Sequence, residues 1–137
     1  MIIVTGAAGF IGSCFISKLN EENFNDVVAV DDFSDKKKSA NLSGKTISKF
    51  VHRDELMDFI RENHRFIEII FHIGARTDTT EFNVEIFDRL NLNYTKSLWQ
   101  LCVEFGLPLV YASSAATYGA GELGYKDDHT LDRKSTR

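Results

Sequence analysis

The sequence has few cysteines, a single proline and no long apolar run among its 137 residues. Cys14 and Cys102 are the two cysteines, and both lie at apolar positions of helix-like segments, so we expect reduced thiols in the core. No C-x-x-C pair is present, and we predict no metal site. No apolar stretch approaches the roughly 18 residues that span a bilayer, and the first residues carry no signal-peptide pattern. These absences lead us to expect a cytoplasmic protein that does not contact a membrane.

The sequence also lacks an excess of basic residues. Its 16 lysines and arginines are outnumbered by 20 aspartates and glutamates, which gives a formal net charge of −4. This balance argues against a nucleic-acid-binding surface, and we expect no nucleic-acid partner. The basic run at 36–38 is short, and a solvated loop is its simplest explanation. The share of apolar residues, 43%, is typical of one soluble globular domain with its own core.

Short apolar runs alternate with segments of helical periodicity. The apolar runs predict strands at Ile2–Val4, Asp26–Val30, Ile47–Val51, Phe66–His72 and Leu109–Ala112. The helical patterns start at Phe10, cover Asp54–Asn63 with Asp54 as the cap, and cover Phe82–Phe105, whereas 34–48 is polar and irregular. Such an alternation implies a doubly wound parallel sheet that is covered on both faces. We predict an α/β domain over residues 1–119, truncated after the fifth strand, and a polar tail over 120–137 that is disordered or not native.

Three glycines separate the first predicted strand from the first predicted helix. Gly6, Gly9 and Gly12 follow the spacing G-x-x-G-x-x-G. The first glycine allows a tight turn, the second removes a Cβ where the backbone must approach a pyrophosphate, and the third lets the helix pack close to the sheet. The amides at the start of the helix then offer N–H donors and a partial positive charge to phosphates. The pattern therefore predicts a phosphate site.

An acidic pair ends the second predicted strand, about 20 residues beyond the glycine turn. A carboxylate of Asp31 or Asp32 can accept hydrogen bonds from the ribose hydroxyls of NAD, and it would repel the 2′-phosphate of NADP. The lysines at 36–38 and Arg53 are near enough in sequence to compensate that repulsion. We therefore expect a Rossmann-like NAD(P)-binding domain, and these residues leave NAD and NADP both open.

Further candidates follow the fourth predicted strand, where a doubly wound sheet places its ligands. Gly74 and Ala75 would let a cofactor lie against the backbone, and Arg76 could meet a phosphate at the rim. His72 is most simply a buried, hydrogen-bonded histidine. Asn91 is a poor residue for a helix interior, so we expect it to bond to the backbone near the cofactor, whereas Asn93 fits a solvent-facing position.

The fifth predicted strand leads into a serine-rich segment, Ser113-Ser114-Ala115-Ala116-Thr117-Tyr118-Gly119. Hydroxyl side chains at the carboxyl end of a strand can bind a substrate hydroxyl or carbonyl group. Ser114 or Thr117 could therefore share a proton during hydride transfer. An ordinary loop is the alternative explanation for this segment.

Taken together, these motifs resemble the extended short-chain dehydrogenase/reductase family. The matching segments are T-G-A-A-G-F-I-G at 5–12, D-D at 31–32, H-I-G-A-R at 72–76, N-x-N-Y at 91–94 and S-S-A-A-T-Y-G at 113–119. Within the family, the segments at 74–81 and 111–119 and the K-x-x-N-L at 38–42 are similar to nucleotide-sugar epimerases of lipopolysaccharide heptose synthesis. The resemblance covers residues 1 to about 119.

The resemblance implies a tightly held NADP and a reaction in which a sugar carbon is oxidised and reduced again from the opposite face. It implies an ADP-heptose-type nucleotide sugar as the substrate and a homo-oligomer when the protein is full length. Ser114 would lie beside the reacting hydroxyl, and Lys38 and Arg53 would favour NADP. The resemblance assigns cofactor contacts to Phe10, Ile11, Asp31, Asp32, Lys38, Arg53, Ala75 and Asn91.

One feature departs from the family pattern. The family's Y-x-x-x-K pair should follow the serine motif, yet neither Tyr118 nor Tyr125 has a lysine four residues later. The sugar-binding C-terminal domain is also missing from these residues. We therefore expect an N-terminal fragment that binds cofactor weakly and has no epimerase activity alone. The alternatives are another hexose epimerase, a dehydratase, which Ala115 and Ala116 disfavour, and a non-catalytic nucleotide-binding module.

Overall fold

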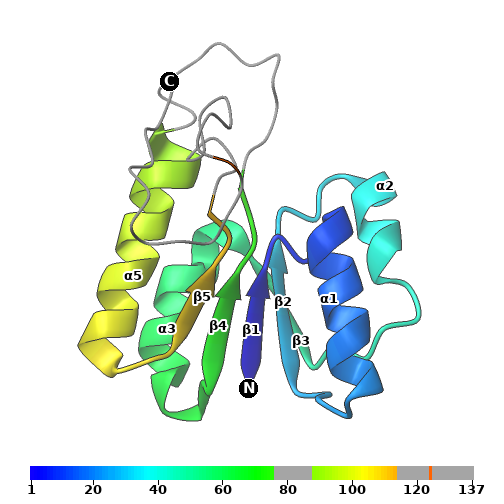
Figure 1. Cartoon of the computed structure of the whole chain (residues 1–137), viewed down its shortest axis with the longest axis horizontal. Coiled ribbons are helices and arrows are strands. Elements are labelled where there is room, and N and C mark those ends of the chain that lie inside the picture. Colours follow the sequence, from blue (N-terminus) through cyan, green and yellow to red (C-terminus); the bar gives the residue numbers. More distant parts are fainter. Residues whose placement is uncertain (76–87, 114–123, 125–137) are drawn as a thin grey trace.

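A computed structural model describes residues 1–75, 88–113 and 124, and its core is one five-stranded sheet (Figure 1). All four strand pairings are parallel, in the order β3-β2-β1-β4-β5. The strands are β1 Ile2–Thr5, β2 Val27–Asp31, β3 Lys49–His52, β4 Ile69–His72 and β5 Leu109–Tyr111. The central strand is β1. Strands β2 and β3 follow on one side of it, and β4 and β5 lie on the other side, so the strand order changes direction after β3 as in Rossmann folds. The prediction of a doubly wound sheet is confirmed.

The helices lie on both faces of this sheet. The α-helices are α1 Phe10–Glu21, α2 Lys36–Ser39, α3 Leu56–Asn63 and α5 Tyr94–Phe105. The short 3₁₀ turns are η1 Ala40–Leu42, η2 Arg53–Glu55 and η3 His64–Phe66, and the π-helical turn η4 Asp88–Asn93 precedes α5. Of the described helices, none is long and apolar enough to cross a membrane.

Two apolar cores follow from the alternation of side chains along the strands. Ile3 of β1 faces α3 and α5 and packs with Leu56 and Leu98. Its neighbour Val4 faces the other side and packs with Ile16 of α1. Because both faces of the central strands are buried, all four residues of β1 are inaccessible to solvent or nearly so. The carboxyl ends of these strands are thereby held in fixed positions.

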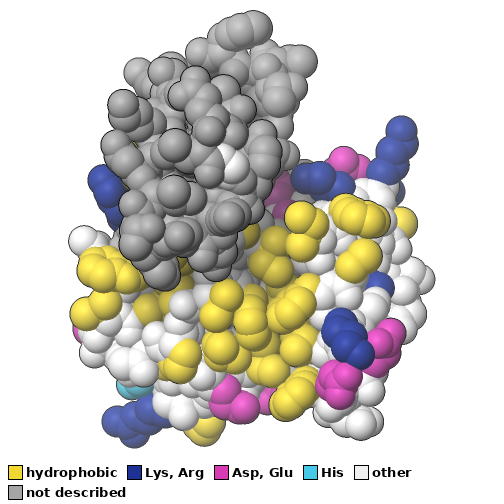
Figure 2. Space-filling view, viewed as in Figure 1, with side chains coloured by type: hydrophobic (Ala, Val, Ile, Leu, Met, Phe, Trp, Pro, Cys, Tyr) yellow, Lys and Arg dark blue, Asp and Glu magenta, His cyan; other side chains and the backbone are white. Residues whose placement is uncertain are grey.

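The α1 side of β4 and β5 is less covered. Ile69, Phe71 and Ile73 are only partly buried there, and Val110, which pairs with Phe71, is 51% exposed. Figure 2 shows a band of apolar side chains between β5 and α1 in this view. This face therefore presents an apolar surface beside the strands that form the site.

Several local expectations need correction. The segment expected to be irregular contains α2, because the Asp35 carboxylate accepts hydrogen bonds from the amides of Lys37 and Lys38 at 2.8 and 3.4 Å. Strand β4 begins at Ile69 rather than Phe66, since the chain first completes the turn η3. Cys14 is exposed on α1, so only Cys102 is a core thiol.

The helix boundaries also differ in detail. Asp54 is not the side-chain cap; instead its amide donates to His52 Nδ1 at 3.3 Å. Helix α5 starts at Tyr94 and ends at Phe105 as predicted, and the positive φ of 66° at the following residue suits Gly106. The predicted helix at 82–87 and the predicted tail, apart from Gly124, lie outside the described residues.

Candidate functional site

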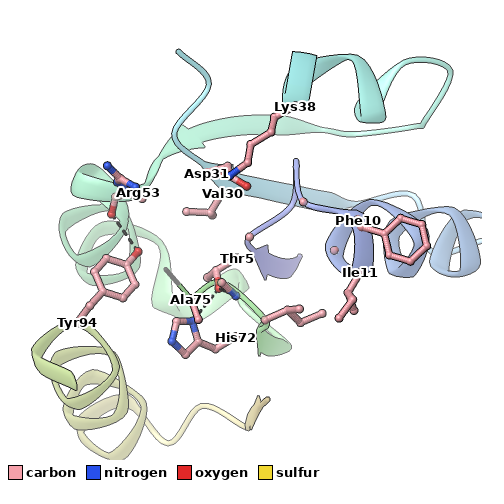
Figure 3. Close-up of a pocket in the computed structure, with 15 residues that line it drawn as sticks. Thr5, Phe10, Ile11, Val30, Asp31, Lys38, Arg53, His72, Ala75 and Tyr94 are labelled. Carbon is pink, nitrogen blue, oxygen red and sulfur yellow. Dashed lines mark hydrogen bonds between the residues drawn. The ribbon is translucent and has the colours of Figure 1, made fainter. Parts of the chain in front are cut away.

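A cleft of about 660 Å³ opens at the carboxyl ends of β1, β2 and β4 (Figure 3). These strand ends supply Thr5, Asp31 and His72 to its walls. Nine of the residues predicted to bind cofactor line the cleft, namely Gly6, Gly9, Phe10, Ile11, Gly12, Asp31, Lys38, Arg53 and Ala75. Residues that are up to 69 positions apart in the sequence therefore meet in one site.

The glycine turn packs directly against the segment that follows β4. Gly6 has a φ of +67°, and a Cβ added there would lie 2.6 Å from Gly74 Cα. A Cβ on Gly74 would in turn lie 2.9 Å from the nitrogen of Gly6. Both positions therefore require glycine, because two backbones touch where side chains would otherwise be. The predicted tight turn at Gly6 is confirmed.

Gly12 is needed for a different reason from the one expected. A Cβ at this position would lie 2.1 Å from the carbonyl oxygen of Gly6. The missing side chain therefore lets α1 approach the glycine turn itself, rather than the strands of the sheet. Gly9 is under less constraint: its φ is −71°, and a Cβ would meet Gly6 O at 3.1 Å. Of the three glycines in this turn, Gly9 is thus the one whose replacement the fold tolerates best.

The first turn of α1 could hold an anion by its backbone amides. Within the described part of the chain, no side chain caps this helix and its first turn holds no acidic residue. The first intrahelical bond runs from the Ser13 amide to Gly9 O at 3.0 Å, so the preceding amides have no helical partner. Phe10 and Ile11 flank these amides with side chains that are 81% and 65% exposed. The helix dipole adds a partial positive charge at the same place.

Asp31 connects the glycine turn to the end of β2. One carboxylate oxygen accepts the Ala8 amide at 2.9 Å, and the other accepts the Asp32 amide at 2.8 Å. Each oxygen has a second lone pair, so the carboxylate can still accept bonds from ligand hydroxyls. Asp31 can therefore shape the phosphate loop and receive a polyol at the same time.

Two cations reach the same side of the cleft. Lys38 extends from α2 toward Asp31 in Figure 3, and Arg53 approaches from η2. Arg53 Nη2 lies 3.0 Å from Asp32 Oδ2, and the buried Arg53 Nε lies 3.8 Å from Asp54 Oδ1 but has no hydrogen-bond partner among the described residues. Hydrogen bonds from Ser34, and then the Arg53 charge, lower the pKa of the Asp32 carboxyl. Arg53 thus keeps donor capacity beside a carboxylate that stays ionised.

The K-x-x-N-L segment has a clear structural role. Lys38 lines the cleft, Asn41 Nδ2 donates to Ala8 O at 2.9 Å, and Leu42 is buried in the α1-side core. The asparagine and the leucine therefore fix the short α2–η1 segment against the glycine turn. This attachment places the lysine at the rim of the cleft.

His72 is buried and hydrogen-bonded, as expected. Its Nδ1 lies 2.7 Å from Thr5 Oγ1, and its Nε2 lies 2.9 Å from Thr95 Oγ1. Burial lowers the pKa of the imidazole, so the ring is neutral near pH 7. Its ring also stacks on Tyr94, at 5.8 Å between ring centroids. Tyr94 lines the cleft and donates its hydroxyl to Arg53 O at 2.9 Å.

Not every predicted residue lines the cleft. Asp32 pairs with Arg53 but is not a lining residue, and Asn91 is partly buried in η4 and does not line the cleft either. Arg76 and Ser114 lie outside the described residues. Asn93 is exposed, as expected. The described residues contain no cluster of three or more potential metal ligands.

Thr5, Val30, Ile73 and Tyr94 also line the cleft but were not predicted as cofactor contacts. Thr5 and Tyr94 belong to the T-G and N-x-N-Y segments, so the sequence carried a signal for both. Val30 and Ile73 are apolar residues at strand ends, where core and lining positions look alike in sequence. The complete cleft offers amides to a diphosphate, a carboxylate to a polyol and cations to a further anion.

Known proteins resemble the chain in sequence and in fold. It is 44% identical over 130 residues to an ADP-L-glycero-D-manno-heptose-6-epimerase from Fusobacterium nucleatum, covering 93% of this chain and 39% of the relative. The crystal structure of a Helicobacter pylori ADP-L-glycero-D-manno-heptose-6-epimerase has a TM-score of 0.75 at 23% identity, covering 99% of this chain and 45% of that one. A Bacillus cereus UDP-glucuronic acid 4-epimerase, solved in complex with NAD, has a TM-score of 0.70 at 24% identity, covering 86% and 41%.

The chain thus spans about two fifths of the length of these proteins. The structural matches agree with the Rossmann-like topology, and the sequence match extends across the glycine turn, the acidic pair and the cleft. The profile of the NAD dependent epimerase/dehydratase family matches residues 2–136, and the chain therefore belongs to this family.

Proposed function

We propose that these residues form the NADP-holding part of a nucleotide-sugar epimerase that acts on an ADP-heptose-type substrate. The observation that carries the proposal is the uncapped first turn of α1 at the cleft, beside the Asp31 carboxylate. The 44% identity to a heptose epimerase supports the choice of substrate. The proposal places the protein in the cytoplasm, and the free thiols of Cys14 and Cys102 suit that reducing compartment.

The cleft suits a dinucleotide on physical grounds. A diphosphate needs several N–H donors and little steric hindrance, and the first amides of α1 beside Gly9 provide both. An adenosine ribose needs an acceptor, and Asp31 has free lone pairs. A flat ring needs a wall with little or no side chain, and Gly74 and Ala75 both line the cleft.

NADP is favoured over NAD by the cations at the rim. Arg53 Nε, which has no hydrogen-bond partner among the described residues, and the Lys38 ammonium could both meet a 2′-phosphate. The repulsion from the acidic pair is reduced because Arg53 is paired with Asp32 and the amides bind Asp31.

In the proposed mechanism the described residues bind the dinucleotide and orient it. The bound dinucleotide supplies a hydride acceptor and donor, so that a sugar carbon is oxidised and then reduced from its opposite face. The amides of α1 hold the diphosphate, and Asp31 holds the ribose. We place Ser114, which lies outside the described residues, beside the reacting hydroxyl, where it would share a proton.

Titration calorimetry with NADP and NAD tests the cofactor assignment. Lys38→Ala should weaken NADP binding about tenfold, which equals about 1.4 kcal/mol, and should leave NAD binding nearly unchanged. Lys37→Ala is the matched control, because Lys37 lies on the same helix but does not line the cleft. Equal losses for the two cofactors, or equal effects of the two variants, would contradict the assignment.

We also propose that the 137 residues alone bind cofactor without turning over sugar. Tyr94, Tyr111, Tyr118 and Tyr125 all lack a lysine four positions later, so no Y-x-x-x-K pair is present to move the proton. The same observation favours a non-catalytic nucleotide-binding module as the second candidate. Conversion of an ADP-heptose by the purified chain above a no-enzyme control would refute the inactivity.

A full-length protein would form homo-oligomers in this proposal. The outer side of α5 carries Trp99 and Val103 with exposures of 58% and 63%, and an assembly could bury them. Light scattering on a full-length protein tests this point, and a strictly monomeric mass at high concentration would contradict it.

A further inference from the structure

A hydrogen-bonded chain joins three elements beneath the cleft. Thr5 ends β1, His72 ends β4, and Thr95 lies in the first turn of α5. His72 bonds to both threonine hydroxyls, at 2.7 and 2.9 Å, and is 5% exposed while Thr5 is 3% exposed. Figure 3 shows the side chains of His72 and Thr5 turned toward one another.

The hydroxyl of Thr5 has a second partner. It accepts the amide of Gly74 at 3.1 Å. Thr5 directly precedes Gly6, and Gly6 touches Gly74 closely enough to exclude a Cβ on either residue. One hydroxyl therefore sets the distance between the glycine turn and the segment after β4, which form adjacent walls of the cleft.

From this geometry we propose that Thr5 and His72 are positioning residues for the dinucleotide: His72 orients the Thr5 hydroxyl, and Thr5 sets the separation of the two backbone walls. The inference rests on the proposed function, since it concerns the same cleft. The amides of the glycine turn bind phosphates well only when the adjacent wall holds the turn at the correct distance. Neither side chain needs to touch the ligand for this role.

Counting the protons gives the direction of each bond. Thr5 has one hydroxyl proton, and its oxygen already accepts the Gly74 amide. If the ring proton lay on Nδ1, the Thr5 hydroxyl proton would have no acceptor among the described residues that bond to Thr5. A neutral ring with its proton on Nε2 satisfies every partner, because Thr5 donates to Nδ1 and Nε2 donates to Thr95.

The two threonines give a matched pair of variants. Thr5→Val keeps the shape but removes the hydroxyl that binds Gly74, so NADP dissociation constants should rise roughly fivefold or more. Thr95→Val removes only the far partner of His72 and should change the dissociation constant less than about twofold. Both variants leave a buried group unpaired, so both should unfold at a lower temperature. Thr5→Ser restores the hydroxyl and should restore affinity.

The affinity of the folded protein distinguishes positioning from a merely structural role. Equal affinity of Thr5→Val and wild type, or equal losses in both valine variants, would overturn the inference. If wild type itself bound neither NADP nor NAD, the proposed function would fail, and the inference with it. Wild-type binding with unaltered Thr5→Val affinity would overturn the inference alone.

A second pair of variants applies if Thr5→Val does not fold. In His72→Asn the side-chain amide can take the place of Nδ1 and keep the hydrogen bond to Thr5. In His72→Gln the longer side chain can take the place of Nε2 and keep the hydrogen bond to Thr95. His72→Asn should therefore bind NADP several-fold more tightly than His72→Gln. The opposite order, or equal affinities, would overturn the inference.

Discussion

Replacing Gly9 with alanine separates dinucleotide binding from folding better than any other change in the glycine turn. The added Cβ would meet only Gly6 O, at 3.1 Å, and the φ of −71° suits any residue. Alanine is a poorer helix cap than glycine, but it also reduces the entropy of the unfolded chain, and each effect is about 0.5–1 kcal/mol. The free energy of unfolding should therefore change by less than about 1 kcal/mol.

The effect on binding should be larger. The new methyl group lies where the proposal places the diphosphate against the first amides of α1, so the two can no longer approach. We expect NADP to bind at least about tenfold more weakly, a loss of about 1.4 kcal/mol or more. At a ligand concentration of about 100 times the wild-type dissociation constant, ligand stabilisation would fall from about 2.7 to about 1.4 kcal/mol.

Thermal unfolding with and without NADP measures both quantities in one experiment. For a chain of this size, about 1 kcal/mol corresponds to roughly 3–5 °C in Tm. The variant without ligand should therefore unfold within a few degrees of wild type, while its NADP-induced shift should be about half as large. A folded Gly9→Ala protein with the full ligand-induced shift would refute the reasoning.

Two further predictions concern stability. Gly12→Ala places a Cβ 2.1 Å from Gly6 O, so it should destabilise the fold by about 2 kcal/mol or more, and chemical denaturation showing wild-type stability would contradict the close contact. His72 has a folded pKa below its usual 6.5, so the unfolded chain binds more protons and stability should fall as the pH drops below about 6.5. His72→Asn should show a flatter pH dependence over the same range, and an unchanged slope would assign the effect to other groups.

The fold was predictable because local patterns and strand burial agree. The apolar runs at 2–4 and 26–30 overlap with β1 and β2, and α5 ends at Phe105 as expected. Errors occurred where a local hydrogen bond overrides composition. The Asp35 cap turns a lysine run into α2, and η3 shortens the start of β4. The hydrophobic periodicity of a sequence gives no signal for such capping hydrogen bonds.

The sequence predicted which residues form the site better than it predicted which of them contact one another. The spacing of Gly6, Gly9 and Gly12 indicates phosphate binding, yet Gly12 accommodates the turn and not the sheet. The contact between Gly6 and Gly74 joins positions 68 residues apart, and a single sequence gives no distance between them. The same applies to the bond from Asn41 to Ala8.

The central claim is that free backbone amides at the start of α1 bind the phosphates. Amide NMR of the chain during titration with NADP tests this most directly. We expect the amide signals of Phe10, Ile11 and Gly12 to shift in proportion to saturation, in the direction expected for new hydrogen bonds. Saturable binding that leaves these three signals in place would show that the phosphates bind elsewhere.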